Sequence, residues 1–188
     1  KIVTAPARGT SVQRNFGAAL ARGRFLLFLD ADVLPATDYL ENFLRLTEEK
    51  KADVAVAWLI PESNRKIDRL TSPLVNYLTL EVSLKAAPVS TGANMFFRKD
   101  IFFNLGGFNE KLKVSEDSDM AARALKQGYR YHVLRQPKIR LSMRRFDKEG
   151  RLHYVLKCAQ LVILGKIFGH EKAARKVNYQ YGHYSKSD

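Results

Sequence analysis

The chain has 188 residues, and its 32 Lys and Arg against 19 Asp and Glu give a formal net charge of +13 at pH 7. Because 46% of the residues are hydrophobic and 27% are charged, the composition is that of a globular domain and excludes a disordered tail. One cysteine excludes an internal disulfide framework and a CxxC-type zinc site, and the apolar runs are too short for a membrane-spanning helix.

The first half of the chain alternates between helical and strand-like patterns. Apolar residues recur either at helical spacing or in short uninterrupted runs, and Ser72 followed by Pro73 is a typical helix start. The apolar run that ends just before Asp30 is typical of a strand buried on both faces of a parallel sheet. The elements expected here are a helix over 11–21, a strand over 25–29, a helix over 37–50, a strand over 52–60 and a helix over 72–87.

The second half continues the alternation. Ser115 is a suitable helix cap, and Gly128 is a natural residue to follow a helix end. Strands that alternate with helices predict an α/β sandwich with a mostly parallel central sheet. The elements expected here are a strand over 95–97, helices over 100–105 and 116–127, strands over 129–134 and 139–143, and an amphipathic helix over 151–168.

Two carboxylates, Asp30 and Asp32, directly follow the apolar strand of residues 25–29. Open α/β sheets bind ligands at the carboxyl ends of their strands, and alternate residues of an extended chain share a side. Oxygen ligands of this kind suit Mg²⁺ or Mn²⁺ held jointly with substrate phosphates. The simpler interpretation is that two polar residues open a loop.

A second acidic cluster, formed by Glu116, Asp117 and Asp119, lies at the start of a predicted helix. Acids at this position interact favourably with the helix dipole, which is a purely structural explanation. A carboxylate that points into a cleft would instead serve as general base toward a substrate hydroxyl.

Basic side chains offer a similar choice between structure and function. Arg144 and Arg145 are suited to clamp a diphosphate, because the guanidinium fork matches phosphate oxygens, but they are equally consistent with a solvated edge. Near the start of the chain, Arg14 and Asn15 leave the same two interpretations open.

Four segments, in this order, resemble motifs of family 2 glycosyltransferases with the GT-A fold. They are residues 14–32, which end in Asp30-Ala31-Asp32, and residues 92–98, 105–110 and 115–129. The resemblance covers most of residues 8–146 and implies a GT-A-type, Rossmann-like α/β/α sandwich over 1–148. The family's opening strand–helix–strand unit does not precede Lys1, so we expect an N-terminally incomplete domain, followed by an amphipathic helical appendage over 149–188.

The resemblance also implies a role for each candidate residue. Asp32 would bind a divalent metal, Mn²⁺ or Mg²⁺, and Asp30 would support the metal or the donor ribose. Asp117 would be the general base, with Glu116 positioning the acceptor or the base. The resemblance further implies donor contacts at Arg14, Asn15, Arg144 and Arg145, and acceptor contacts at Gly92, Asn94 and Asp119.

The function implied is inverting, metal-dependent transfer of a sugar from a nucleotide-diphosphate sugar, with UDP the commonest nucleotide. The acceptor would be a saccharide or a lipid-linked molecule, and no nucleic-acid partner is expected. The alternatives are a catalytically silent scaffold and a basic nucleic-acid-binding module suggested by the pI near 9.9. One cysteine and no export signal favour the cytoplasm, with a peripheral position at the membrane left open.

Overall fold

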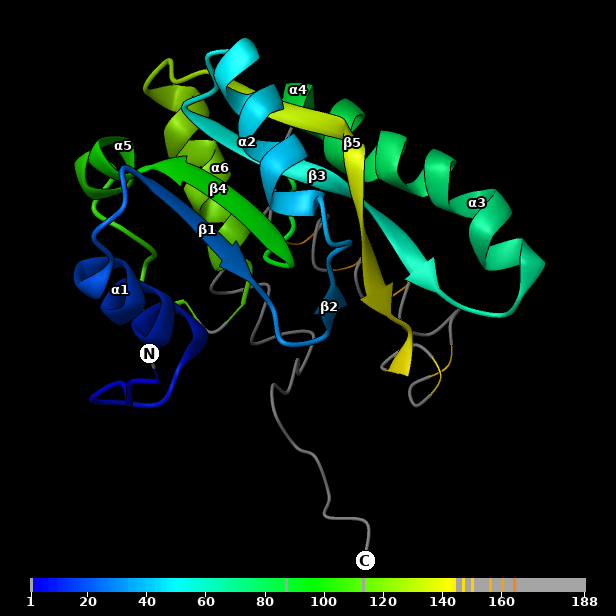
Figure 1. Ribbon diagram of the computed structural model, residues 1–188, viewed down its shortest axis with the longest axis horizontal. Helices are drawn as coiled ribbons and strands as arrows, with labels where there is room; N and C mark the ends of the chain where they lie inside the picture. Colours follow the sequence, from blue (N-terminus) through cyan, green and yellow to red (C-terminus); the bar gives the residue numbers. More distant parts are fainter. Residues whose placement is uncertain are drawn as a thin grey trace, which may run out of the picture.

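A five-stranded mixed sheet forms the centre of the fold in the computed structural model (Figure 1). The structure describes residues 2–86, 88–112 and 114–144, with Asp147, Gly150, Leu156, Gln160 and Leu164 beyond them. The strands lie in the order β1-β4-β3-β5-β2. They are β1 (Phe25–Leu29), β2 (Val33–Leu34), β3 (Val54–Glu62), β4 (Asn94–Arg98) and β5 (Tyr131–Ser142).

The prediction of a mostly parallel sheet is wrong. Only β3 and β5 pair in parallel, and the other three pairings are antiparallel. Alternation of strands and helices indicates layers, but it does not fix strand direction, which depends on the end of the sheet to which each connection returns. The connection before β4 ends beside the end of β1, so that Leu29 pairs with Asn94 and Phe25 with Arg98.

Helices cover both faces of this sheet, as expected for an α/β/α sandwich. They are α1 (Thr10–Leu20), α2 (Tyr39–Glu49), α3 (Lys66–Asn76), the π-helix η1 (Tyr77–Val82), α4 (Ser83–Ala86), α5 (Lys99–Asn104) and α6 (Glu116–Lys126). In β3, Val54 and Val56 face α1, α5 and α6, whereas Ala55 and Ala57 face α2. This period-two alternation divides the core between the two faces of the sheet.

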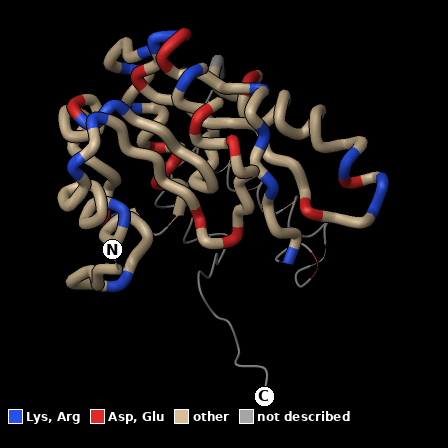
Figure 2. Tube along the Cα trace, in the orientation of Figure 1, with Lys and Arg blue, Asp and Glu red and all other residues tan. Residues whose placement is uncertain are grey.

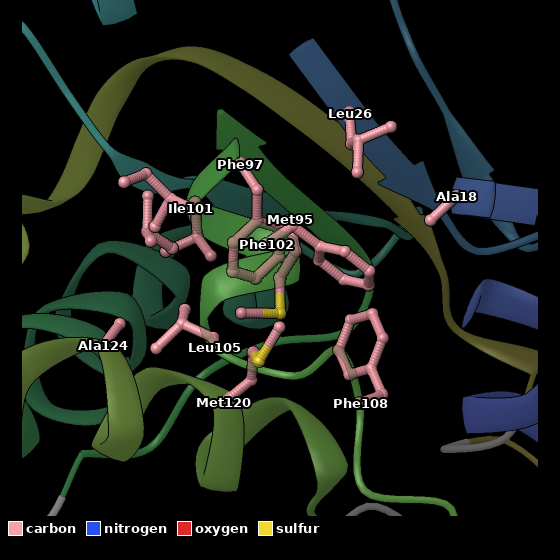
Figure 3. Packing of buried hydrophobic residues seen from close by; sticks show 12 residues of the cluster. Ala18, Leu26, Met95, Phe97, Ile101, Phe102, Leu105, Phe108, Met120 and Ala124 are labelled. Atoms are coloured by element: carbon pink, nitrogen blue, oxygen red, sulfur yellow. The ribbon is translucent and has the colours of Figure 1, made fainter. Parts of the chain in front are cut away.

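Aromatic and sulfur-containing side chains fill the core on the α6 face (Figure 3). Phe97 and Phe102 pack edge to face, with ring centroids 5.4 Å apart, an arrangement that aromatic pairs favour. Met95 and Met120 are fully buried beside them. This packing joins β4, α5 and α6, and it therefore fixes the start of α6, where the second acidic cluster lies.

Two predicted boundaries are wrong for identifiable reasons. Pro73 lies inside α3, which begins at Lys66, and Ser72 Oγ donates to the carbonyl of Leu59 at 2.9 Å. That tertiary bond ties the helix to β3.

The predicted strands over 129–134 and 139–143 are one strand, β5, which passes through a cis peptide bond before Pro137.

The predicted helix over 151–168 and the predicted appendage over 149–188 lie outside the described residues, apart from the isolated positions named above. Among the helices that the structure describes, none is both long enough and apolar enough to cross a membrane.

Candidate active site

The turn after β1 places both acids of the first motif at one end of the sheet. The backbone N–H of Asp30 donates to Ala93 at 3.2 Å, which ties the turn to the segment before β4. The N–H of Ser142 donates to the carbonyl of Asp32 at 2.9 Å, so the end of β5 lies beside the second acid. Both acidic residues remain partly exposed. Two carboxylates therefore meet solvent where β1 and β5 end.

Arg14 joins this turn to the second acidic cluster. Its Nη2 lies 2.6 Å from Asp30 Oδ1, and its Nη1 lies 2.9 Å from Glu116 Oε1. The same Nη2 donates to the carbonyl of Gly92 at 3.1 Å. The guanidinium is only 11% exposed, and it lies over the ring of Phe108 at 5.3 Å. One side chain thus connects three segments that the sequence analysis assigned to donor, acceptor and catalytic motifs.

Glycine at position 92 leaves room for the close approach of this guanidinium. A Cβ atom built there would lie 2.8 Å from Nη2 of Arg14, closer than real Cβ contacts. The segment that contains Gly92 is the acceptor motif of the resemblance, so its backbone is fixed against the same cation that holds Asp30 and Glu116.

The two acids at the start of α6 differ from ordinary carboxylates. Burial, followed by the charge of Asp117, raises the pKa of Glu116 to about 7, although Arg14 opposes the shift. Burial also raises the pKa of Asp117, against hydrogen bonds from the N–H groups of Ser118 and Gly92. The two groups titrate as a pair, so a proton remains on the pair close to neutral pH. A carboxylate with a raised pKa in a cleft is suited to general-base chemistry.

Arg14 itself stays fully charged. Burial works to lower its pKa, but the carboxylates of Asp30 and Glu116 outweigh burial and raise the pKa of the guanidinium.

Two of the predicted contact residues hold the loop before α6. Asn15 Nδ2 donates to the carbonyl of Phe108 at 2.9 Å, and its Oδ1 accepts the N–H of that residue at 2.8 Å. Asp119 pairs with Arg123 at 2.7 Å, and Arg123 donates to the carbonyl of Gly107 at 2.8 Å. The side chains of Asn15 and Asp119 are thus bonded to the protein around the candidate site.

Asn94 is completely buried, and its amide bonds both backbone groups of Ala57 in β3. It continues the β3–β4 ladder beyond the last backbone pair between these strands, which joins Ala55 to Phe96. Its side chain therefore joins β3 to β4 within the sheet.

The two arginines predicted to contact the diphosphate lie where the continuous described range ends, at residue 144. Arg144 is exposed just beyond β5, and its N–H donates to Ser142 Oγ at 3.4 Å. Ser142 in turn bonds the carbonyl of Asp32, and the diphosphate contact of Arg144 stays a prediction. Arg145 lies outside the described residues.

Sequence reasoning missed a second line of polar contacts behind Asp117. The hydroxyl of Tyr131 lies 2.8 Å from Ser90 Oγ, and the N–H of Ser90 donates to Ser118 Oγ at 3.2 Å. Burial raises the pKa of Tyr131, and the charge of Asp117 adds to that shift, so the phenol stays protonated. These residues belong to three separate segments, and no local motif marks them.

A cleft of about 880 Å³ lies at the other end of the sheet and includes none of the predicted site residues. Arg24 and Phe25 at the start of β1 line it, together with Arg98 at the end of β4. The candidate active site is instead the place where the acids with raised pKa values meet, because proton-transfer chemistry needs such groups.

Solved structures share this architecture. A mannosyltransferase of Pyrobaculum calidifontis, PcManGT, solved with GDP-Man and Mn²⁺, superposes with a TM-score of 0.60 at 19% identity, over 94% of this chain and 46% of that one. Residues 1–349 of S. aureus TarS, solved with UDP-GlcNAc, superpose with a TM-score of 0.54 at 18% identity, over 73% and 39% of the two chains. At these identities the likeness establishes the fold alone.

Curated relatives match at a similar level. The minor teichoic acid biosynthesis protein GgaB of Bacillus subtilis is 27% identical over 140 residues, which is 72% of this chain and 15% of that protein. Glycosyltransferase AglE of Haloferax volcanii is 26% identical over 125 residues, 65% of this chain and 40% of that protein. The chain thus spans less than half the length of either relative.

The family model described as "Glycosyl transferase family 2" matches residues 1–106, more than half of the chain. That range contains Arg14, the Asp30–Asp32 turn and Gly92, three of the four segments that meet at the candidate site. By this match the chain belongs to glycosyl transferase family 2.

Proposed function

We propose that the chain transfers a sugar from a nucleoside-diphosphate sugar to an acceptor hydroxyl, with inversion at the anomeric carbon. The observation that supports this most directly is the contact of Arg14 with both Asp30 and Glu116. It brings the predicted donor end of β1 within the span of one guanidinium of Glu116, the residue next to the predicted general base, Asp117. Relatives that act on nucleotide sugars, such as PcManGT with GDP-Man, agree with this class of donor.

The donor would bind where β1 and β5 end. Among the described residues, no group of three or more His, Cys, Asp or Glu side chains forms a metal site. Mg²⁺ and Mn²⁺ nevertheless bind through one or two carboxylates plus substrate phosphates, and Asp32 with Asp30 fits that donor set. When bound, the metal would neutralise negative charge on the departing nucleoside diphosphate.

The acceptor would bind beside Asp117. The Asp117 carboxylate takes the proton of the acceptor hydroxyl, and the hydroxyl oxygen forms a bond to the anomeric carbon. The bond from that carbon to the diphosphate oxygen breaks, and the electron pair leaves with the nucleotide. Glu116 and Arg14 act as positioning residues, because their ion pair fixes the start of α6 and the charge around the base.

Removing the Asp32 carboxylate is expected to abolish metal-dependent nucleotide binding. Calorimetric titration of UDP, GDP and dTDP, with and without Mn²⁺, should show one nucleotide bound with metal by the unchanged chain. Asp32→Ala should weaken that binding at least about tenfold, because one of two carboxylate ligands is lost. Asp38→Ala is the matched control, since Asp38 lies in the same segment but bonds Asn42 at the surface.

Equal binding by Asp32→Ala and the unchanged chain would contradict the assignment of Asp32. A folded chain that binds none of the three nucleotides would point instead to an incomplete donor site or to a silent scaffold.

The rate is expected to rise with pH through about 7. The pKa values of Glu116 and Asp117 are both raised, so this pair stays protonated up to a higher pH than an ordinary carboxyl group does. The protonated pair cannot accept the proton of the acceptor and is inactive. Glu116→Gln removes a negative neighbour, so the pKa of Asp117 should fall and the acidic limb should shift to lower pH. The measurement is the pH profile of kcat/KM for nucleotide release from UDP-GlcNAc or GDP-mannose, whichever nucleotide the titration selects.

Glu41→Gln, on the exposed surface of α2, is the control for this profile and should leave it in place. An unshifted acidic limb in Glu116→Gln would show that the pair does not limit the rate.

A further inference from the structure

The helix that follows β3 exposes a line of large apolar side chains to solvent. Leu70 is 75% exposed and Leu74 is 59% exposed, although side chains of this kind usually lie in a core. Successive members are three or four positions apart and therefore share one face of the helix. We call this line the α3 stripe; it consists of Ile67, Leu70 and Leu74 on α3 and Leu78 on η1, with Val75 on α3 and Val82 on η1 beside it.

The opposite side of the helix is firmly attached to the sheet. Asn76 is buried, and its side chain bonds both the N–H and the carbonyl of Leu59 at 2.8 and 2.9 Å. Farther along, Leu80 is buried, and Glu81 accepts a bond from Trp58 at 3.1 Å. Since these contacts fix how the helix is rotated, the α3 stripe is exposed by the fold itself.

Charge is arranged around the stripe in a definite way. Lys and Arg positions gather at the N-terminal end of α3 (Figure 2), where the sequence has Arg65, Lys66 and Arg69. The one acid among them, Asp68, accepts a bond from Ser63 Oγ. No charged residue occurs from 70 to 80. The result is an apolar face with a cationic end, on a chain of net charge +13.

We propose that the α3 stripe lies on the surface of an anionic membrane, with its leucines at the boundary between headgroups and acyl chains. An apolar helical face with flanking cations is the pattern of helices that rest in this interface. None of the described helices could span a bilayer, so the contact would lie on the membrane rather than pass through it.

Charge disfavours the other candidate occupants. A second copy of the chain also has a net charge of +13. Residues 151–168 have an amphipathic pattern that would suit packing against the stripe, but they include Arg151, Lys157 and Lys166 and no acid. Either occupant would bring positive charge toward the cationic end of α3, whereas an anionic lipid surface would neutralise it.

The contact would also orient the candidate active site. Glu62 at the end of β3 pairs in register with Ser142, whose N–H bonds Asp32. The cationic start of α3 follows Glu62 by three residues, so it lies at the same end of the sheet as the Asp30–Asp32 turn. Membrane binding does not depend on the proposed function, but it would place that site near an acceptor in the headgroup layer.

The test is flotation of the full chain with vesicles of phosphatidylcholine, with or without about 30% phosphatidylglycerol. We expect binding to the anionic vesicles only, weakened by salt. Leu70→Gln with Leu74→Gln should lower the partition coefficient at least about tenfold, because two apolar side chains no longer enter the interface. Replacing Arg65, Lys66 and Arg69 with Gln should lower it about 100-fold on anionic vesicles.

The matched control is Leu20→Gln with Leu40→Gln, which removes two comparably exposed leucines from α1 and α2 and should leave partitioning unchanged. Circular dichroism and nucleotide titration of every variant separate lost membrane binding from lost folding or a lost donor site. The proposal is overturned if the full chain does not bind anionic vesicles, or if the α3 stripe variant binds as well as the unchanged chain. Sedimentation that shows lipid-free self-association abolished by the stripe variant would also overturn it, because a second copy would then be the occupant.

Discussion

Replacing Asp117 with Asn is expected to lower kcat by about 10²–10⁴-fold, the usual contribution of a general base. The amide keeps the shape of the side chain and still accepts the N–H of Ser118, which bonds Oδ1 at 2.7 Å. It has no carboxylate to take the acceptor proton. Nucleotide affinity should stay within about twofold, because the lost interaction acts in the transition state and not in donor binding.

The control for this variant is Asp100→Asn. Asp100 pairs with Arg98 on the surface, at the end of β4 farthest from the Asp30–Asp32 turn. Single-turnover nucleotide release measures chemistry, and calorimetry measures donor binding. If Asp117→Asn retains the rate of the unchanged chain, Asp117 is not the base. If affinity falls as far as the rate, the residue contributes to donor binding instead.

Arg14→Ala is expected to lower the free energy of unfolding by about 3–5 kcal/mol, because it leaves buried carboxylate charge without a partner. Most of the loss should come from Glu116, whose side chain is 5% exposed, and less from Asp30, which water reaches. The loss should be larger at pH 8 than at pH 5. The pKa of Glu116 in the folded state is raised to about 7, so this carboxyl is mostly neutral at pH 5 and mostly charged at pH 8. Only the charged form needs the Arg14 cation, so removing Arg14 costs more free energy of unfolding at pH 8.

Urea unfolding at both pH values measures this effect. Arg45→Ala is the matched control: its ion pair with Glu49 is exposed, and such pairs contribute about 0–1 kcal/mol. Arg14→Lys keeps the charge without the fork that reaches two carboxylates, and it should fall between Arg14→Ala and the unchanged chain. A cost for Arg14→Ala as small as that for Arg45→Ala would show that the two acids do not need this cation.

Local sequence patterns were sufficient to locate most of the elements. The run of residues 25–29 coincides with β1, and the predicted helices over 11–21, 37–50 and 116–127 lie within two residues of α1, α2 and α6 at each end. Periodicity works in these places because each element buries one continuous apolar face or run.

Patterns failed where contacts distant in the sequence decide the outcome. The start of α3 could not be read from Ser72 and Pro73, because the bonds from Ser72 and Asn76 to Leu59 hold the helix in place. The direction of β4 depends on where its preceding connection returns to the sheet. Neither determinant has a local sequence signature.

In the candidate site, too, local motifs predict some features, whereas contacts between distant residues decide others. Motifs and the family resemblance predict roles for Asp30, Asp32 and Asp117, because such chemistry depends on residue type and on position after a strand or before a helix. The ion pairs of Arg14 were not predicted, since its partners are 16 and 102 residues away. A single sequence shows that an arginine is present, but the fold determines which acids it meets.

The shared guanidinium has a consequence for how this family can diversify. Loss of Arg14 would leave Asp30 and Glu116 without their shared cation. A side chain larger than glycine at position 92 would displace the Arg14 guanidinium. Asp30, Glu116 and Gly92 are therefore constrained as one inherited unit rather than as separate positions. In an alignment of homologues, sequences without an arginine at position 14 should also lack the acid at position 116, and they should accept side chains larger than glycine at position 92.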